Sequence, residues 1–137
     1  MSSDVPEAPE NDPADLNGLW VLIVEDSWAL GTSLQKLLES RGANVMGLAA
    51  TAAEAERLIA QRTPDVALVD INLRRGEQSH ALIDRLHDRG IRVVVITGYS
   101  GASLPPSKAA AILQKPIRED LLLASLRAGN VQRDRKE

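Results

Sequence analysis

The sequence predicts an α/β domain in which short buried strands alternate with amphipathic helices around a parallel sheet. Two patterns carry this prediction: apolar runs of four or five residues recur along the chain, and helical patterns with leucines at three- and four-residue spacing separate them. The third observation is the length, because 137 residues suffice for one domain with its own core and are too few for two ordinary ones.

The expected strands are short apolar runs bounded by polar or turn-forming residues. The second of them is the weakest signal, and the third closes on an aspartate. The five expected strands are 20–24, 44–48, 66–70, 93–96 and 111–114.

Four full helices are expected, three between the first four strands and one after the last strand. The first presents a leucine face and ends near Gly42, and the second opens at a capping box formed by Thr51 and Glu54. The third ends before Gly90, a typical residue just past a helix C-terminus. The third and the last are expected over 78–88 and 119–127.

The segment before the last strand is unusually short. Only 17 residues separate Thr97 from Lys115, and Pro105 and Pro106 lie among them. A crossover with its helix usually needs at least about ten to twelve residues, and here a strand must fit as well. We therefore expect the fourth helix, which would lie between the fourth and fifth strands, to be shortened or irregular.

Composition excludes several classes of protein. The chain has no cysteine, which excludes disulfides and thiolate metal sites and fits a cytoplasmic protein. No apolar run approaches the roughly 18 residues of a membrane span, and we expect no membrane contact. Without the five acidic residues of the first 15 positions the net charge changes from −3 to about +2, too small for nucleic-acid binding. We expect a disordered acidic leader over 1–17, a domain over 18–128 and a tail over 129–137.

Five chemically active side chains follow or close the predicted strands. Glu25 and Asp26 follow the first strand, Asp70 closes the third, Thr97 follows the fourth and Lys115 follows the fifth. Because ligands bind at the carboxyl ends of strands in open parallel sheets, these side chains are expected to meet at one edge. The pattern favours a site for a divalent metal ion and a phosphoryl group.

Each residue type suits a role in that chemistry. The Asp70 carboxylate can be a covalent nucleophile toward a phosphoryl group. Asp26 and Glu25, together with the backbone carbonyl of Asn72, could hold Mg²⁺, which prefers oxygen ligands. Lys115 would offset the charge of the phosphoryl oxygens, and Thr97 would donate a hydrogen bond to one of them.

Four motifs together resemble the receiver domain of two-component response regulators. They are Val-Leu-Ile-Val-Glu-Asp-Ser at 21–27, Pro-Asp-Val-Ala-Leu-Val-Asp-Ile-Asn-Leu at 64–73, Ile-Thr-Gly at 96–98 and Gln-Lys-Pro at 114–116. The resemblance covers about 19–128. It implies the flavodoxin-like strand order 2-1-3-4-5 of a doubly wound sheet and a cis Lys115–Pro116 bond.

The resemblance also implies a function. Asp70 would take a phosphoryl group from a sensor histidine kinase, with Mg²⁺ held by Asp26, Asp70 and the Asn72 carbonyl, and by Glu25 through water. The segment 92–99 resembles the Phe-Ala-Thr-Gly-aromatic motif of the FAT GUY single-domain receivers. Ordinary receivers carry a switching Tyr or Phe where this chain has Ile112, so signal relay by Tyr99 and an inert Tyr99 both stay open.

We expect a stand-alone phosphoacceptor that is not an enzyme in the usual sense. It would signal to an unknown downstream protein or phosphotransfer partner, or act as a phosphate sink, and a homodimer stays open. The alternative is a phosphorylation-independent adaptor with the same fold. An aspartyl-nucleophile phosphatase ranks lowest because Asn72 replaces the second aspartate that such enzymes use.

Overall fold

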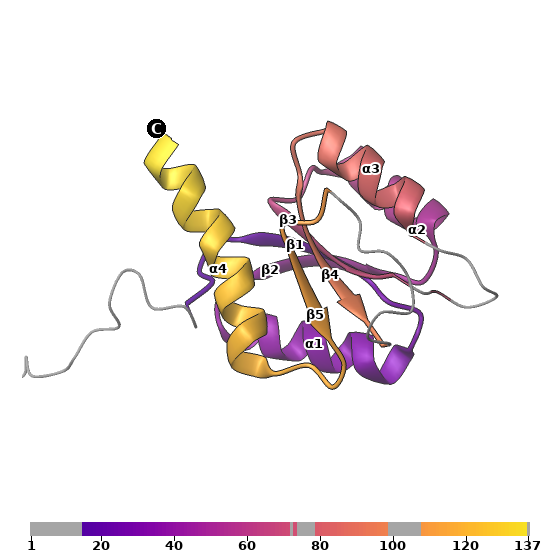
Figure 1. The fold of residues 1–137 in the computed structure, drawn as a ribbon, viewed down its shortest axis with the longest axis horizontal. Coiled ribbons are helices and arrows are strands. Elements are labelled where there is room, and N and C mark those ends of the chain that lie inside the picture. The colour runs from indigo at the N-terminus through magenta and orange to yellow at the C-terminus, as the bar shows by residue number, and fades with distance from the viewer. Residues whose placement is uncertain (1–14, 72, 74–78, 99–107, 137) are drawn as a thin grey trace, which may run out of the picture.

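The sheet is five-stranded and wholly parallel, with the order β2-β1-β3-β4-β5 (Figure 1). The computed structural model describes residues 15–71, 73, 79–98 and 108–136. The elements are β1 Trp20–Val24, α1 Trp28–Ser40, β2 Asn44–Ala49, α2 Ala52–Gln61, β3 Val66–Asp70, α3 His80–Asp88, β4 Arg92–Thr97, β5 Ala111–Gln114 and α4 Glu119–Lys136. This confirms the predicted flavodoxin-like, doubly wound fold.

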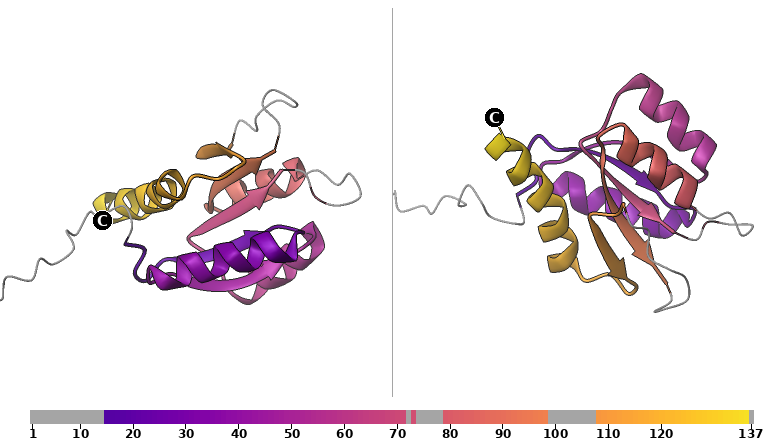
Figure 2. Two further views of the ribbon diagram at one scale, coloured as in Figure 1. Left: turned by 90° about the horizontal axis from the view of Figure 1, so that it is seen from below. Right: turned by 45° about the horizontal axis from the view of Figure 1, so that its top comes forward.

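Helices cover both faces of the sheet, α1 and α4 on one face and α2 and α3 on the other (Figures 1 and 2). Side chains of a strand point alternately to the two faces. In β1, Val21 and Ile23 pack in the core with α1 and α4, whereas Leu22 and Val24 pack in the core with α2 and α3. The central strands are therefore apolar on both sides, as the uninterrupted runs in the sequence predict.

Helix ends follow the expected local chemistry. Gly42 and Gly90 lie just past α1 and α3 with φ of +97° and +80°, in the region that glycine adopts most easily. Each donates its N–H to the third carbonyl before it, Gly42 to Glu39 at 3.0 Å and Gly90 to His87 at 2.9 Å. The Thr51 hydroxyl accepts from the Glu54 N–H at 3.1 Å, which confirms the predicted start of α2.

Two boundaries differ from the sequence-based expectation. The last helix does not end near residue 127 but continues to Lys136, and its C-terminal end extends beyond the sheet in Figure 1. Leu16, placed by the sequence in the leader, is fully buried in the core beside α1, and its N–H donates to the Arg41 carbonyl at 2.9 Å. Propensity alone signalled neither the burial of Leu16 nor the continuation of α4 to Lys136.

The shortened fourth helix that the sequence predicts between β4 and β5 falls mainly on residues 99–107, which lie outside the described residues. The flanking described positions, 98 and 108–110, are not helical. Lys115–Pro116 is a cis peptide bond, as expected.

Candidate functional site

The carboxyl ends of the strands gather the charged residues named by the sequence. Glu25 follows β1, Asp70 is the last residue of β3 and Lys115 follows β5. The register of the parallel strands sets the positions of these residues along the strand direction. Asp70 lies opposite Ile96 of β4, and Thr97 lies opposite Gln114 of β5. We call this end of the sheet the carboxyl edge, and the end where the strands begin the amino edge.

Three carboxylates converge at the carboxyl edge. Glu25, Asp26 and Asp70 each offer an oxygen within 4.8 Å of the oxygens offered by the other two. Glu25 and Asp70 are each only 4% exposed, whereas Asp26 is half-buried and reachable from solvent. Their placement follows from the fold because β1 and β3 are neighbours in the centre of the sheet.

Lys115 supplies a positive charge to this cluster. Its Nζ lies 3.4 Å from Asp70 Oδ2 and 3.9 Å from Glu25 Oε1. The backbone holds the lysine there, because its N–H donates to the Thr97 carbonyl at 2.8 Å. Among the described residues, this ammonium group thus lies beside a group of three carboxyl groups.

Glu25 shows the electrostatic cost of this arrangement. Burial, with smaller contributions from the negative charges of Asp70 and Asp26, raises the pKa of Glu25 from 4.5 to about 7 against the opposing effects of Ser27 and Lys115. The Ser27 N–H donates to Glu25 Oε2 at 3.0 Å, but the buried Oε1 has no hydrogen-bond partner among the described residues. A buried acceptor of this kind is unusual and calls for a functional explanation.

A divalent cation with oxygen ligands fits this donor set. Mg²⁺ binds one or two carboxylates, keeps several waters and takes phosphate oxygens as further ligands. Such an ion would offset the negative charge of these carboxylates, and a water bound to it could donate to Glu25 Oε1. The Asn72 carbonyl, predicted as a further ligand, lies outside the described residues.

Two other predicted positions have clear places. Thr97 ends β4 at the carboxyl edge, half-exposed and one strand away from Asp70. Ile112, at the position where ordinary receivers carry an aromatic switch, lies on β5 and is 43% exposed. Tyr99 lies outside the described residues.

One buried polar residue at the carboxyl edge was missed by the sequence analysis. Ser79 precedes α3, is fully buried and donates its hydroxyl to the Asp70 carbonyl oxygen at 2.8 Å. The sequence carried one signal for it, a serine near the start of a predicted helix, but such serines usually cap their own helix.

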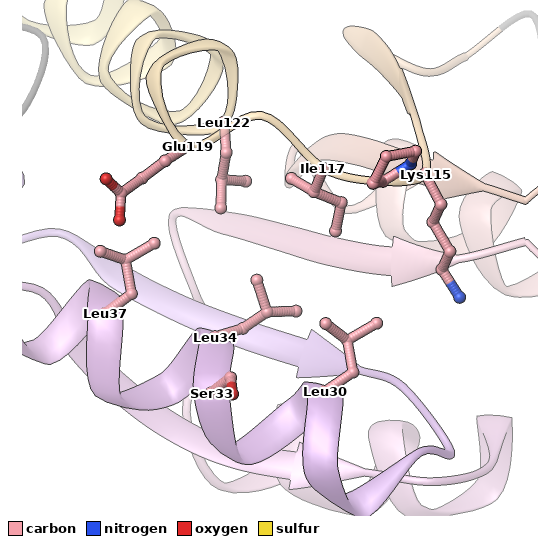
Figure 3. Close-up of a pocket in the computed structure, with 9 residues that line it drawn as sticks. Leu30, Ser33, Leu34, Leu37, Lys115, Ile117, Glu119 and Leu122 are labelled. Atoms are coloured by element: carbon pink, nitrogen blue, oxygen red, sulfur yellow. The ribbon is translucent and has the colours of Figure 1, made fainter.

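A groove opens beside the cluster between α1 and the start of α4 (Figure 3). Its volume is about 440 Å³, and its walls are mostly apolar. Lys115 contributes to the lining at one end, so the groove adjoins the carboxyl edge. The lining residues are Leu30, Ser33, Leu34, Leu37, Lys115, Pro116, Ile117, Glu119 and Leu122.

Comparison with known families identifies the class of protein. The family model for the response regulator receiver domain matches residues 21–127. The chain therefore belongs to the response regulator receiver domain family, as its motifs and fold predict. The FAT GUY subtype stays a prediction, since Tyr99 lies outside the described residues. None of the described helices combines the length and apolar character that a membrane crossing requires.

Individual relatives are regulators that contain receiver domains. The phyllosphere-induced regulator PhyR of Methylorubrum extorquens is 31% identical over 102 residues, which are 72% of this chain and 38% of PhyR. The crystal structure of the anti-anti-sigma factor PhyR from Bartonella quintana matches with a TM-score of 0.76 and 25% identity, over 91% of this chain and 52% of that one. A CheY-like receiver domain protein from Methanospirillum hungatei matches with a TM-score of 0.78 and 28% identity, over 88% and 100%.

The chain thus spans between about a third and about a half of the length of the PhyR proteins it matches. The CheY-like protein, in contrast, is covered over its whole length.

Proposed function

We propose that this receiver accepts a phosphoryl group on Asp70 in a Mg²⁺-dependent reaction with a sensor histidine kinase. The observation that supports this most strongly is the convergence of Glu25, Asp26 and Asp70 within 4.8 Å, with the Lys115 Nζ 3.4 Å from the Asp70 carboxylate. The resulting aspartyl phosphate signals through protein contacts or acts as a phosphate sink.

The reaction is a displacement at phosphorus. An Asp70 Oδ attacks, a P–O bond forms, the P–N bond to the histidine of the kinase breaks, and the histidine leaves with the bonding electrons and takes up a proton. Lys115 faces the phosphoryl oxygens and offsets their charge as a point cation. Asp26, Asp70 and the Asn72 carbonyl would hold Mg²⁺ directly and Glu25 would hold it through water, and the bound ion would neutralise the remaining negative charge of the phosphoryl group.

Thr97 connects the modification to the rest of the domain. Its position at the end of β4 suits a hydrogen bond from its hydroxyl to a phosphoryl oxygen, made only after Asp70 is modified. Such a bond would draw the β4 end toward β3 and change the surface beyond it.

The partners are proteins. The kinase must bring its histidine to Asp70, and the apolar groove that Lys115 adjoins is a surface its helices could contact on the way. Because related PhyR is named an anti-anti-sigma factor, an anti-sigma factor is one candidate for the downstream partner. A homodimer is a second route for output.

We expect a cytoplasmic receiver domain over 18–128, extended by the buried Leu16 on its N-terminal side and by α4 to Lys136 on its C-terminal side, that acts as a phosphoacceptor and not as an enzyme on other substrates. The protein-glutamate methylesterase/protein-glutamine glutaminase 3 of Hahella chejuensis shares a 53-residue stretch with this chain at 43% identity, which is 15% of its own length. That overlap supports no esterase activity for this chain.

Intact-protein mass after brief incubation with acetyl phosphate tests the function. We expect a one-phosphoryl mass increase that needs Mg²⁺ and is lost in Asp70→Asn. Asp65→Asn, a matched change five residues away on the same chain segment, should keep it. If wild-type protein gains no mass and beryllofluoride with Mg²⁺ leaves its NMR spectrum unchanged, the adaptor function replaces this one.

A further inference from the structure

Three helices start with a hydroxyl residue at the N-cap, but only two of these residues cap their helix. The Ser27 hydroxyl accepts from the Leu30 N–H of α1 at 3.2 Å, and the Thr51 hydroxyl accepts from the Glu54 N–H of α2 at 3.1 Å. Ser79, at the same position of α3, makes no such bond. The first turn of α3 gives up a capping interaction usually worth about 1 kcal/mol.

The Ser79 hydroxyl points instead to the strand that carries the phosphoacceptor. It donates to the Asp70 carbonyl oxygen at 2.8 Å, and the Ser79 N–H donates to the next carbonyl, that of Ile71, at 3.2 Å. Ser79 is 0% exposed, so water does not compete for these bonds. The hydroxyl and the N–H of Ser79 thus donate to two successive carbonyls at the end of β3.

The peptide group between Asp70 and Ile71 is therefore held at both of its polar ends. Its carbonyl accepts from Ser79, and its N–H donates to the Ile96 carbonyl of β4 at 2.9 Å. This peptide group is bonded directly to the Cα of Asp70. Its orientation sets the direction in which the Asp70 side chain leaves the backbone, and with it the position of the attacking oxygen.

We propose that Ser79 is a positioning residue for phosphorylation: its hydroxyl fixes the Asp70–Ile71 peptide and so aligns the Asp70 carboxylate for attack. This inference rests on the proposed function of Asp70. The hydroxyl bonds the backbone and not the carboxylate, so Ser79 acts through Asp70 and takes no part in the bond changes at phosphorus.

The test compares the rate of phosphoryl adduct formation with acetyl phosphate and Mg²⁺ in four proteins: wild type, Ser79→Ala, Ser79→Thr and Ser40→Ala. Ser40 is the matched control because its hydroxyl also donates to a backbone carbonyl, that of Leu37 at 2.6 Å, but at the far end of α1. Rates are measured by intact mass at a temperature where circular dichroism shows every variant fully folded.

Ser79→Ala should slow adduct formation about tenfold, since small misplacement of a reacting group costs one to two orders of magnitude. Ser79→Thr, which keeps the hydroxyl, should restore most of the rate, and Ser40→Ala should react like wild type. Should Ser79→Ala fail to fold, Ser79→Cys keeps the size of the side chain with a much weaker donor and should be slow in its place.

A folded Ser79→Ala or Ser79→Cys protein that reacts at the wild-type rate would overturn the inference while leaving the proposed function intact. Equal slowing in Ser79→Ala and Ser40→Ala would also overturn it, because a general loss of helix stability would then explain both. Absence of an adduct on wild type would overturn the proposed function and this inference together.

Discussion

The two ends of the central strands differ in how their charged groups are surrounded. At the amino edge, Asp65 and Trp20 exchange two hydrogen bonds: the Asp65 carboxylate accepts from the Trp20 N–H and the Asp65 N–H donates to the Trp20 carbonyl, both at 2.9 Å. The Arg62 guanidinium stacks over the Trp20 ring, 3.6 Å from its centroid. At the carboxyl edge, Glu25 and Asp70 are buried beside each other, and one Glu25 oxygen finds no hydrogen-bond partner in the part of the chain that the structure describes.

The difference separates stability from function within one sheet. The contacts at the amino edge satisfy the groups that take part in them and tie β1 to β3. The carboxyl edge keeps like charges together out of water, which lowers stability unless a cation or a phosphoryl group completes the site. Electrostatic conflict of this kind is typical of functional sites, where it persists because the surrounding fold is stable enough to hold it.

Mg²⁺ should produce the largest change in the free energy of unfolding, and it should do so only by binding at the carboxyl edge. At a hundredfold excess over its dissociation constant, a ligand of the folded state raises the free energy of unfolding by about 2.7 kcal/mol. Urea unfolding with and without Mg²⁺ measures this gain. Asp26→Asn should lose most of it and Asp65→Asn should keep it; an equal gain in Asp26→Asn would place the metal elsewhere.

The raised pKa of Glu25 predicts a pH dependence with a definite sign. Between pH 4.5 and about 7, the folded protein keeps a proton on Glu25 that the unfolded chain has released. The folded state therefore binds more protons, and without metal the free energy of unfolding falls as pH rises through this window. Glu25→Gln removes this slope, so its stability relative to wild type should rise from pH 4.5 to about 7 and level off above.

Chelator-treated protein is the proper sample for that comparison, and Mg²⁺ should flatten the wild-type curve because it favours the ionised carboxylate. Parallel curves for wild type and Glu25→Gln across the window would contradict the assignment of the slope to Glu25.

The same substitution at the two edges should change stability in opposite directions. In Mg²⁺-free buffer above pH 7, where Glu25 is ionised, Asp70→Asn removes a buried charge that repels Glu25 and should stabilise the fold by about 1 kcal/mol, despite losing the pair with the partly exposed Lys115. Asp65→Asn weakens a charge-assisted hydrogen bond to the Trp20 N–H and should destabilise it by about 1 kcal/mol. Denaturant midpoints of the two variants and wild type, measured under the same conditions, test this prediction. Stability changes of the same sign in both variants would contradict the contrast between the edges.

Arg62→Ala should have the smallest effect. Loss of the stacking over Trp20 is expected to cost about 0.5–1 kcal/mol, the range for cation–π pairs near the surface. The rate of phosphoryl adduct formation should not change, because Arg62 lies at the amino edge. A slower reaction in a fully folded Arg62→Ala protein would show that the two edges are coupled.

The sequence predicted most of the fold because its signals were local and agreed with one another. The apolar runs of β1, β3 and β5, the Thr51 cap and Gly90 each specified their element independently. Leu16 could not be placed, since one leucine after an acidic segment shows no periodicity and its burial depends on the distant end of α1. The length of α4 was missed because Gly129 and Asn130, residues that commonly follow the end of a helix, lie within it.

The candidate site could be predicted where its residues lie at the ends of strands that the sequence already indicates. Glu25, Asp26, Asp70 and Lys115 meet because the parallel order brings the ends of their strands together. Ser79 could not be foreseen, because its hydroxyl bond to Asp70 spans nine residues of sequence and replaces a commoner local cap. The Glu25 oxygen without a partner is likewise a property of packing that no pattern of residue types reports.

The most direct test of the central claim is to locate the phosphoryl group on the chain. Borohydride reduction converts an aspartyl phosphate to homoserine, and the tryptic peptide 63–74 contains both Asp65 and Asp70, one from each edge. After treatment with acetyl phosphate and Mg²⁺, fragmentation of this peptide should show homoserine at position 70 alone, and none when Mg²⁺ is omitted. Homoserine at position 65, or none in the presence of Mg²⁺ under conditions where the intact protein gains mass, would contradict the account.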